Sequence, residues 1–380
     1  MNHGHIFGLD LIRALAVLMV LAAHASLMFM PGTSDLATLE PWLLAGLLGV
    51  ELFFVLSGFL IGGILAAEAA RGPLQLRRFW IRRWLRTLPN YYLFLGLNIL
   101  LERVLQGEGP DAWHYLVFLQ NLAWPNPPFF PESWSLAIEE LFYLAAPLLI
   151  VAGRLLPLRR ISPPLLVLLG IGVFTLIRIG WVLLFDPSWD AGVRKVALVR
   201  LDAIAFGVLA VVAVRHFRPG LAVIRIVAGL GSLGTIACLI TWFVLPRDSD
   251  FFARTLWFNL VPLSFAAFLP LAARWQGASL PAWWRTLVHK IALWSYALYI
   301  SHLFVQRILL GVLDWKGETF MQCLLQATAF CLLAIATSAL VYHGYERPWL
   351  RLRDRLAPRA PSASGLYGAT APRPTHSASS

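Results

Sequence analysis

The sequence predicts an all-α fold, a polytopic membrane bundle of about ten transmembrane helices whose N-terminus and C-terminus are cytoplasmic. Of its 380 residues, 59% are hydrophobic and 13% are charged, and the mean hydropathy is +0.70. A soluble domain cannot bury that much apolar surface. Apolar runs of about 20 residues recur along the chain, and this is the length that an α-helix needs to cross the hydrocarbon core. Basic residues gather in alternate connections between these runs, and that alternation sets the orientation.

The apolar runs place the expected spans one after another along the chain. Their approximate ranges are 9–30, 43–66, 88–105, 134–152, 164–185, 194–214, 225–245, 254–272, 290–312 and 320–344. The first is expected to be a retained helix, because the N-terminal MNHGHIFG lacks the basic region and the small-residue cleavage site of a signal peptide. The stretch at 113–124 is too short to span and is followed by the proline cluster PNPPFFP, so we expect a re-entrant or interfacial segment there.

Loop charge orients the spans. With a cytoplasmic N-terminus, the inner connections carry most of the arginine and the outer connections collect acids. The inner basic residues are Arg71, Arg77, Arg78, Arg82, Arg83, Arg86, Arg154, Arg159, Arg160, Arg215, Arg218, Arg225, Arg274, Arg285 and Lys290. This topology accounts for the net charge of +11, so no nucleic-acid partner is expected. We expect one integral-membrane domain at 1–350 and a disordered cytoplasmic tail at 351–380, first basic and then rich in Pro, Ser and Ala.

Ionisable residues within the spans indicate a polar cavity. A charge at membrane depth costs several kcal/mol unless it is paired or hydrated. Nine such residues fall in the middle or outer half of the spans: His24, Glu51, Glu139, Glu140, Arg178, Arg200, Asp202, His302 and Arg307. Arg13 and the tract RRFWIRRWLR at 77–86 fall on the inner side. The sequence therefore predicts a water-filled cavity that opens outward above a basic cluster.

Arg13 and His24 share one stripe of the first span. They lie eleven positions apart, which puts them within about 20° of one helix face and about 16 Å apart along the axis. A lone histidine in an apolar helix is usually a packing residue. Because His24 shares its face with an arginine, we favour a functional role for it.

Other intramembrane charges have structural interpretations. Arg200 and Asp202 fit the neutralisation of charges on other helices better than they fit catalysis. Glu139 and Glu140 diverge by about 100° on a helix, so we expect one of them to be structural. The tract at 77–86 is by default a positive-inside anchor. Charges around a cavity fit a transporter as well as they fit an enzyme. The spacing of these residues alone does not decide between the two.

Cysteine and histidine spacing predicts neither a metal site nor a disulfide framework. Cys238, Cys323 and Cys331 all fall within apolar runs, where we expect reduced packing residues. The chain carries no motif with metal-ligand spacing. We therefore expect no metal cofactor.

Seven stretches resemble, in order, the integral-membrane acyltransferase-3 family, whose members O-acylate sugars and other hydroxyl acceptors. They are GLDLIRALAVLMVLAAHA (8–25), GVELFFVLSGFLIGGIL (49–65), RRWLRTLPNYY (82–92), SWSLAIEELFYL (133–144), RLDAIAFG (200–207), SYALYISH (295–302) and YERPWL (345–350). The first carries the family's arginine and histidine as Arg13 and His24, and the third carries its Arg-x-x-Arg element as Arg83 and Arg86. Each stretch alone is a weak match, but seven in order are specific. Since the sequence ends soon after the last expected span, we expect no fused hydrolase-like domain of the kind that some members carry.

The resemblance implies a donor of the acyl-CoA type, with acetyl-CoA first, and transfer of its acyl group to a hydroxyl. His24 is the implied catalytic base and Arg13 its partner on the donor side, while Arg83 and Arg86 are expected to bind the phosphates of CoA. Supporting or acceptor-side roles fall to Asp10, Glu51, Ser57, Glu139, Arg178, Asp202, Tyr299 and His302. Direct transfer and an acyl-enzyme on a serine or histidine both stay open.

Two classes of function follow. The first is an O-acyltransferase of the bacterial cytoplasmic membrane that modifies a hydroxyl-bearing acceptor, expected to be a carbohydrate. The second is a transporter or flippase for acylated or polyprenyl-linked sugars, although the repeated halves and interrupted helices common in transporters are not visible here. The sequence predicts neither the identity of the acceptor, nor the acyl length, nor the oligomeric state.

Overall fold

A computed structural model describes residues 6–32, 39–155, 160–315 and 317–358, and these residues form helices and loops without a strand. The α-helices are α1 (Phe7–Ser26), α2 (Glu40–Ala69), α3 (Leu76–Gln106), α4 (Trp113–Leu116), α5 (Ser133–Leu155), α6 (Pro163–Phe185), α7 (Asp202–Phe217), α8 (Leu221–Val244), α9 (Phe251–Arg254), α10 (Trp257–Ala272), α11 (Ala282–Arg307), α12 (Phe320–Val341) and α13 (Arg347–Leu356). Short 3₁₀ or π segments are η1 (Leu27–Gly32), η4 (Trp189–Arg194), η5 (Ala197–Val199), η6 (Ile308–Val312) and η7 (Tyr342–Glu346).

Seven helical segments are long and apolar enough to cross a membrane, judged by length and composition. They are Phe7–Phe29, Glu40–Ala69, Ser133–Gly153, Pro163–Phe185, Ala197–Phe217, Leu221–Val244 and Phe320–Leu356. The other three expected spans fall on α3, α10 and α11, of which α10 is an apolar helix of 16 residues. The prediction of an all-α, polytopic membrane bundle is therefore confirmed.

Two expected boundaries differ from the structure. α3 begins at Leu76 rather than near residue 88, because the basic tract at 77–86 is helical and continues directly into the apolar half of the helix. The span expected from residue 194 starts instead at Ala197, where η5 leads into α7, because the backbone at its start bonds to another loop. In that loop the Asn121 carbonyl accepts from the Ala197 amide at 2.8 Å, and the Asn121 side chain donates to the Lys195 carbonyl at 2.6 Å.

α2 is the central helix of the bundle. It packs against α1 on one side and against α7 and α10 on the other. Glycines bring α2 and α7 into backbone contact: a Cβ atom on Gly58 would lie 1.8 Å from the Ile204 carbonyl oxygen, and one on Gly207 would lie 1.9 Å from that of Val55. Small residues at such a crossing replace side-chain contacts with close backbone packing, as is common between membrane helices.

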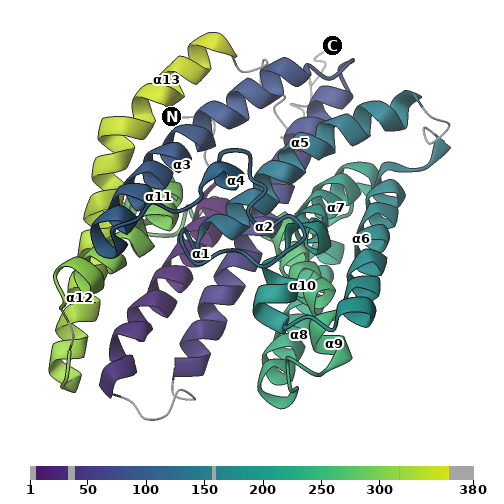
Figure 1. Ribbon diagram of the computed structural model, residues 1–380. Coiled ribbons are helices and arrows are strands. Elements are labelled where there is room, and N and C mark those ends of the chain that lie inside the picture. The colour runs from purple at the N-terminus through teal and green to yellow at the C-terminus, as the bar shows by residue number, and fades with distance from the viewer. Residues whose placement is uncertain (1–5, 33–38, 156–159, 316, 359–380) are drawn as a thin grey trace, which may run out of the picture.

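The helices form two groups on either side of α2 (Figure 1). α1, α3, α11, α12 and α13 lie on one side, and α6 to α10 lie on the other. α1 begins and α13 ends at the same end of the bundle (Figure 1), as both-termini-inside topology requires. Arg82 on α3 forms an ion pair with Asp354 on α13 at 3.2 Å at this end. The helix α13 continues to Leu356, past the boundary expected at 350, and residues 359–380 of the expected tail lie outside the described residues.

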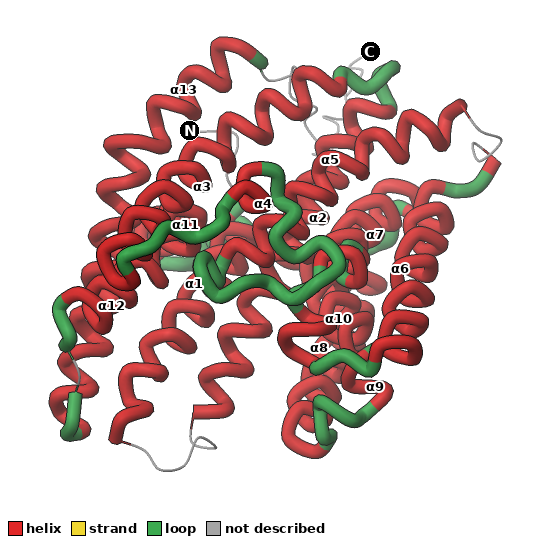
Figure 2. The backbone as a smooth tube through the Cα atoms, viewed as in Figure 1, coloured by secondary structure: helices red, strands yellow, loops and turns green. Residues whose placement is uncertain are grey.

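The segment expected to be re-entrant contains a single short helix, α4, and long loops (Figure 2). It is nevertheless built into the bundle, because Tyr115, Gln120 and Asn121 are each 1% exposed or less. The Tyr91 hydroxyl donates to the Tyr115 carbonyl at 2.8 Å and fixes the segment to α3. The segment leads into the start of α5, whose residues Trp134 and Ser135 line cavities.

Candidate functional site

Two adjoining cavities lie between the helix groups, beside α2. The first, the histidine cavity, has a volume of about 670 Å³ and is lined by His24, His302, Trp134, Asp190, Arg194 and Lys195 among others. The second, the arginine cavity, has a volume of about 340 Å³ and is lined by Asp10, Arg13, Ser57, Arg83, Arg86 and Glu139 among others. Tyr299 and Val50 line both cavities, so the two adjoin at these side chains. Both volumes fall in the range of small-molecule sites, about 300–1,000 Å³.

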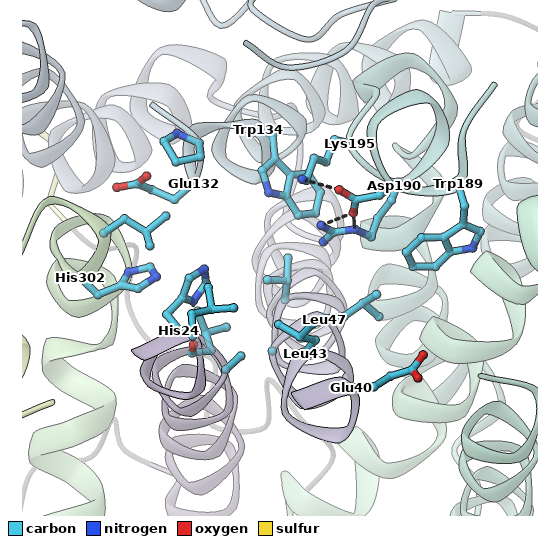
Figure 3. A pocket seen from close by; sticks show the side chains of 18 of the residues that line it. His24, Glu40, Leu43, Leu47, Glu132, Trp134, Trp189, Asp190, Lys195 and His302 are labelled. Carbon is cyan, nitrogen blue, oxygen red and sulfur yellow. Dashed lines mark hydrogen bonds and ion pairs between the residues drawn. The ribbon is translucent and has the colours of Figure 1, made fainter. Parts of the chain in front are cut away.

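His24 projects into the histidine cavity from the last turn of α1 (Figure 3). Its Nδ1 lies 2.9 Å from the Val20 carbonyl oxygen. Because a carbonyl oxygen accepts only, Nδ1 carries the proton and the neutral ring has its basic lone pair on Nε2. The Gln306 side chain donates to the His24 carbonyl at 2.9 Å and links the end of α1 to α11. The fold thus fixes both the orientation and the tautomer of His24.

His302 on α11 lies next to His24 in the same cavity. The two ring centroids are 4.7 Å apart, and the ring planes meet at 69°. His302 is 1% exposed, and its Nδ1 donates to the Tyr299 carbonyl at 2.6 Å. The Tyr299 hydroxyl in turn lies 2.6 Å from the Ser135 Oγ, which fixes α11 against α5. Sequence reasoning names His302 and Tyr299 as supporting residues, and the structure places both beside His24.

The opposite wall of the histidine cavity comes from η4 and the start of α5. Asp190 accepts from Arg194 and from Lys195, each at 2.5 Å, and the Arg194 guanidinium carbon lies 4.8 Å from the Trp134 ring centroid. Burial opposes ionisation of Asp190, but the charges of Arg194 and Lys195 prevail and lower the pKa of its carboxyl. Figure 3 shows this cluster across the cavity from the two histidines. The sequence alone does not indicate this cluster, because only the fold of η4 brings these loop charges to the wall of the histidine cavity.

The arginine cavity gathers cations from two helices. Arg13 on α1 and Arg83 and Arg86 on α3 all line it. Asp10 lies 4.0 Å from Arg13, and its other oxygen lies 2.9 Å from Nδ1 of His289 on α11. The planar guanidinium fork suits phosphate and carboxylate oxygens. A cavity with three such groups can bind a phosphate-bearing compound.

Arg83 is held in place by a cluster on α5 and α2. Its guanidinium carbon lies 3.7 Å from the Tyr143 ring centroid, and one of its nitrogens lies 3.4 Å from Glu139. The Tyr143 hydroxyl donates to Glu139 at 3.0 Å and also contacts Ser57. Glu139 lines the arginine cavity, whereas Glu140 is buried and does not line either cavity.

Three of the predicted supporting residues lie away from both cavities. Arg178 and Asp202, each 0% exposed, form an ion pair at 2.8 Å between α6 and α7. Glu51 on α2 pairs with Arg200, and both are 1% exposed or less. These pairs join neighbouring helices of the bundle. Among the described residues, no group of three or more His, Cys, Asp and Glu side chains is arranged to hold a metal ion.

The fold and the two cavities define a polytopic membrane protein with a histidine site next to a cationic site. The model of the acyltransferase-3 family, described as an acyltransferase domain, matches residues 6–343, so the chain belongs to this family. The resemblance found in the sequence is confirmed. No solved structure matches the chain significantly.

Three curated relatives show how far the similarity extends. Peptidoglycan O-acetyltransferase OatA of Listeria monocytogenes serovar 1/2a (strain ATCC BAA-679 / EGD-e) is 31% identical over 202 residues, which is 48% of this chain and 29% of the relative. YrhL of Bacillus subtilis (strain 168) is 32% identical over 171 residues, or 40% of this chain and 25% of the relative. SACOL0978 of Staphylococcus aureus (strain COL) is 27% identical over 270 residues, or 65% and 42%. The chain therefore spans less than half the length of these relatives.

Proposed function

We propose that this protein is an O-acetyltransferase of the bacterial cytoplasmic membrane that moves an acetyl group from acetyl-CoA to a hydroxyl of a glycan. The observation that carries the proposal is the adjacency of the two cavities at Tyr299, one with a basic histidine nitrogen and one with three arginines. Family membership supports the acyl transfer. The relative named as a peptidoglycan O-acetyltransferase supports a glycan as the acceptor.

The donor binds in the arginine cavity. Arg83 and Arg86 hold CoA phosphates with paired N–H groups, and Glu139 and Tyr143 orient the Arg83 fork. Arg13 lies on the same stripe of α1 as His24 and orients the donor between the phosphates and the reacting carbonyl. The pantetheine arm then reaches past Tyr299 to place the thioester carbon in the histidine cavity.

His24 acts as the general base of a direct transfer. Its Nε2 takes the proton of the acceptor hydroxyl while the hydroxyl oxygen bonds to the thioester carbon. As the tetrahedral intermediate collapses, the C–S bond breaks, the ester stays on the glycan, and the CoA thiolate leaves with the proton that His24 had taken from the hydroxyl. Such general-base assistance is typically worth about 10²–10⁴-fold in rate. The other buried charges hold the scaffold: Arg178 with Asp202, and Glu51 with Arg200.

Turnover of labelled donor tests this function. Purified protein in liposomes receives acetyl-CoA labelled in the acetyl group, together with envelope glycans from cells that lack the protein. The proposal requires label to enter the glycan and free CoA thiol to appear in equal amount. Mass spectrometry of glycans from cells with and without the protein then locates the added acetyl group. Movement of glycan across the bilayer with no consumption of acetyl-CoA would instead establish a transporter.

The donor route also requires a defined orientation. Cysteines introduced at Arg78 and Asp248 should react with an impermeant maleimide from opposite sides, position 78 from the cytoplasm and position 248 from outside. Serine replaces the natural Cys238, Cys323 and Cys331 in this background. Labelling of position 78 from outside would contradict the placement of the arginine cavity on the cytoplasmic side. The related positions Asp35 and Arg159 lie outside the described residues.

A further inference from the structure

His302 has a buried ring nitrogen for which the described residues supply no partner. Its Nδ1 donates to the Tyr299 carbonyl at 2.6 Å, which leaves Nε2 as a hydrogen-bond acceptor. Nε2 is buried and has no hydrogen-bond partner among the described residues, although His302 lines the histidine cavity. A buried polar atom without a partner destabilises the protein, because it has lost its hydrogen bonds to water. The nitrogen is therefore suited to a donor that enters with a ligand.

His24 presents a second accepting ring nitrogen beside His302. Both rings donate through Nδ1 to a carbonyl of their own helix, Val20 for His24 and Tyr299 for His302. Both therefore keep the lone pair of the neutral ring on Nε2. The centroids are 4.7 Å apart, and the two rings lie next to each other on the cavity wall (Figure 3). The cavity wall thus offers two acceptors of hydrogen bonds, and a matching ligand must bring two donors.

Two imidazole nitrogens could also begin a metal site, but a stable site needs further ligands. No group of three or more His, Cys, Asp and Glu in the described part of the chain is arranged for this. Hydroxyls on neighbouring carbons fit better, because two adjacent oxygens can approach two adjacent rings, each at about 2.8 Å from one nitrogen. Secondary hydroxyls around a sugar ring are arranged in this way.

We propose that the histidine cavity binds its acceptor through two neighbouring hydroxyls, one on Nε2 of His24 and the other on Nε2 of His302. This rests on the proposed function, in which the hydroxyl at His24 loses its proton and takes the acetyl group. The hydroxyl at His302 keeps its proton throughout and only donates a hydrogen bond. His302 is then a positioning residue that selects vicinal diols over isolated hydroxyls.

Nuclear magnetic resonance of the histidine rings tests the pairing without catalysis. The full chain, with ¹⁵N in its nine histidines, is placed in liposomes and titrated with cis-1,2-cyclohexanediol or with cyclohexanol. The variants His24→Gln and His302→Gln assign the two Nε2 signals. We expect the diol to shift both signals in one transition and to bind roughly three- to tenfold more tightly than cyclohexanol, the worth of one further hydrogen bond. In His302→Phe the two compounds should bind equally.

Two results would overturn the pairing: a diol that shifts His24 but leaves His302 unchanged, or equal affinity for the two compounds in wild type. Acetyl transfer from labelled acetyl-CoA to envelope glycan is measured on the same samples. If transfer is absent while both ring signals respond to the diol, the proposed function fails and the two-hydroxyl site stands. If transfer proceeds while His302 does not respond, the proposed function stands and the two-hydroxyl site fails.

Discussion

Replacing Asp202 with leucine removes the carboxylate that neutralises Arg178 in the interior of the bundle. Both side chains are 0% exposed, and the Arg178 Nη1 lies 2.9 and 2.8 Å from the two carboxylate oxygens. The remaining guanidinium donors bond to the Thr255 carbonyl at 3.0 Å and to the Asn259 side chain at 2.5 Å. These bonds fix Arg178 in place, so in Asp202→Leu its charge stays buried without a counter-ion.

The expected loss of stability follows from that burial. Removing one partner of a buried ion pair typically costs about 3–5 kcal/mol, which lowers the folding equilibrium constant by between about 10² and 10⁴. The double variant Arg178→Met with Asp202→Leu removes the uncompensated charge and should be more stable than Asp202→Leu alone. It should not reach wild type, because the Thr255 and Val199 carbonyls lose their donors, at about 1–3 kcal/mol for each buried group left unpaired.

Unfolding by SDS in mixed micelles measures the stability of each variant, and acetyl transfer is measured per folded molecule. We expect the order wild type, double variant, single variant in stability, with unchanged transfer per folded molecule. A single variant as stable as wild type would refute the structural role of the pair. A stable variant that no longer transfers acetyl groups would assign Asp202 a role on the acceptor side, which is what the sequence resemblance implies.

Two further perturbations test the donor site and the packing of the bundle. Alanine at Arg83 or Arg86 should raise the KM for acetyl-CoA by between about tenfold and 150-fold, which corresponds to a charge-assisted contact of about 1.5–3 kcal/mol. Lysine at either position should restore only part of the lost affinity, because it lacks the bidentate fork. Arg82→Ala is the control, because Arg82 lies on the same helix but pairs with α13, and it should leave the KM for acetyl-CoA unchanged. An equal rise in this variant would indicate that the tract at 77–86 only anchors the helix. Gly207→Val should unfold the protein at lower SDS concentration, because its Cβ would lie 1.9 Å from a carbonyl oxygen of α2. Gly180→Ala, where no atom lies within 4 Å of the added carbon, should instead stabilise α6 by up to about 1 kcal/mol; a comparable loss in both variants would contradict the close crossing.

The sequence is most informative where a single helix carries the signal. Apolar runs locate the long helices because hydropathy and length are local properties, and α1 shows both its span and the shared stripe of Arg13 and His24. The basic half of α3 was expected to precede the span because hydropathy cannot detect a charged helix. The helix continues because arginine is a good helix former and its charges turn toward a cavity and toward α13.

Pairing between helices could not be predicted from the sequence. Arg178 and Asp202 are both visible as intramembrane charges, but their mutual contact depends on how α6 crosses α7. Likewise, the cluster of Asp190, Arg194 and Lys195 reads as an ordinary outer loop until the π-helical segment η4 brings it to the cavity wall. Tyr143 belongs to a quoted family stretch, yet its contact with Arg83 follows only from the packing of α5 against α3.

The His24→Gln variant tests most directly whether Nε2 of His24 is the base for acyl transfer. Glutamine keeps a polar side chain of similar reach at the end of α1 but offers no basic nitrogen. Acetyl-CoA binding and acetyl transfer are measured on the same folded protein. We predict that binding stays at the wild-type level, because the donor contacts lie in the arginine cavity, while transfer falls by about 10²–10⁴-fold. Folded, donor-binding His24→Gln with near-normal transfer would contradict the assignment.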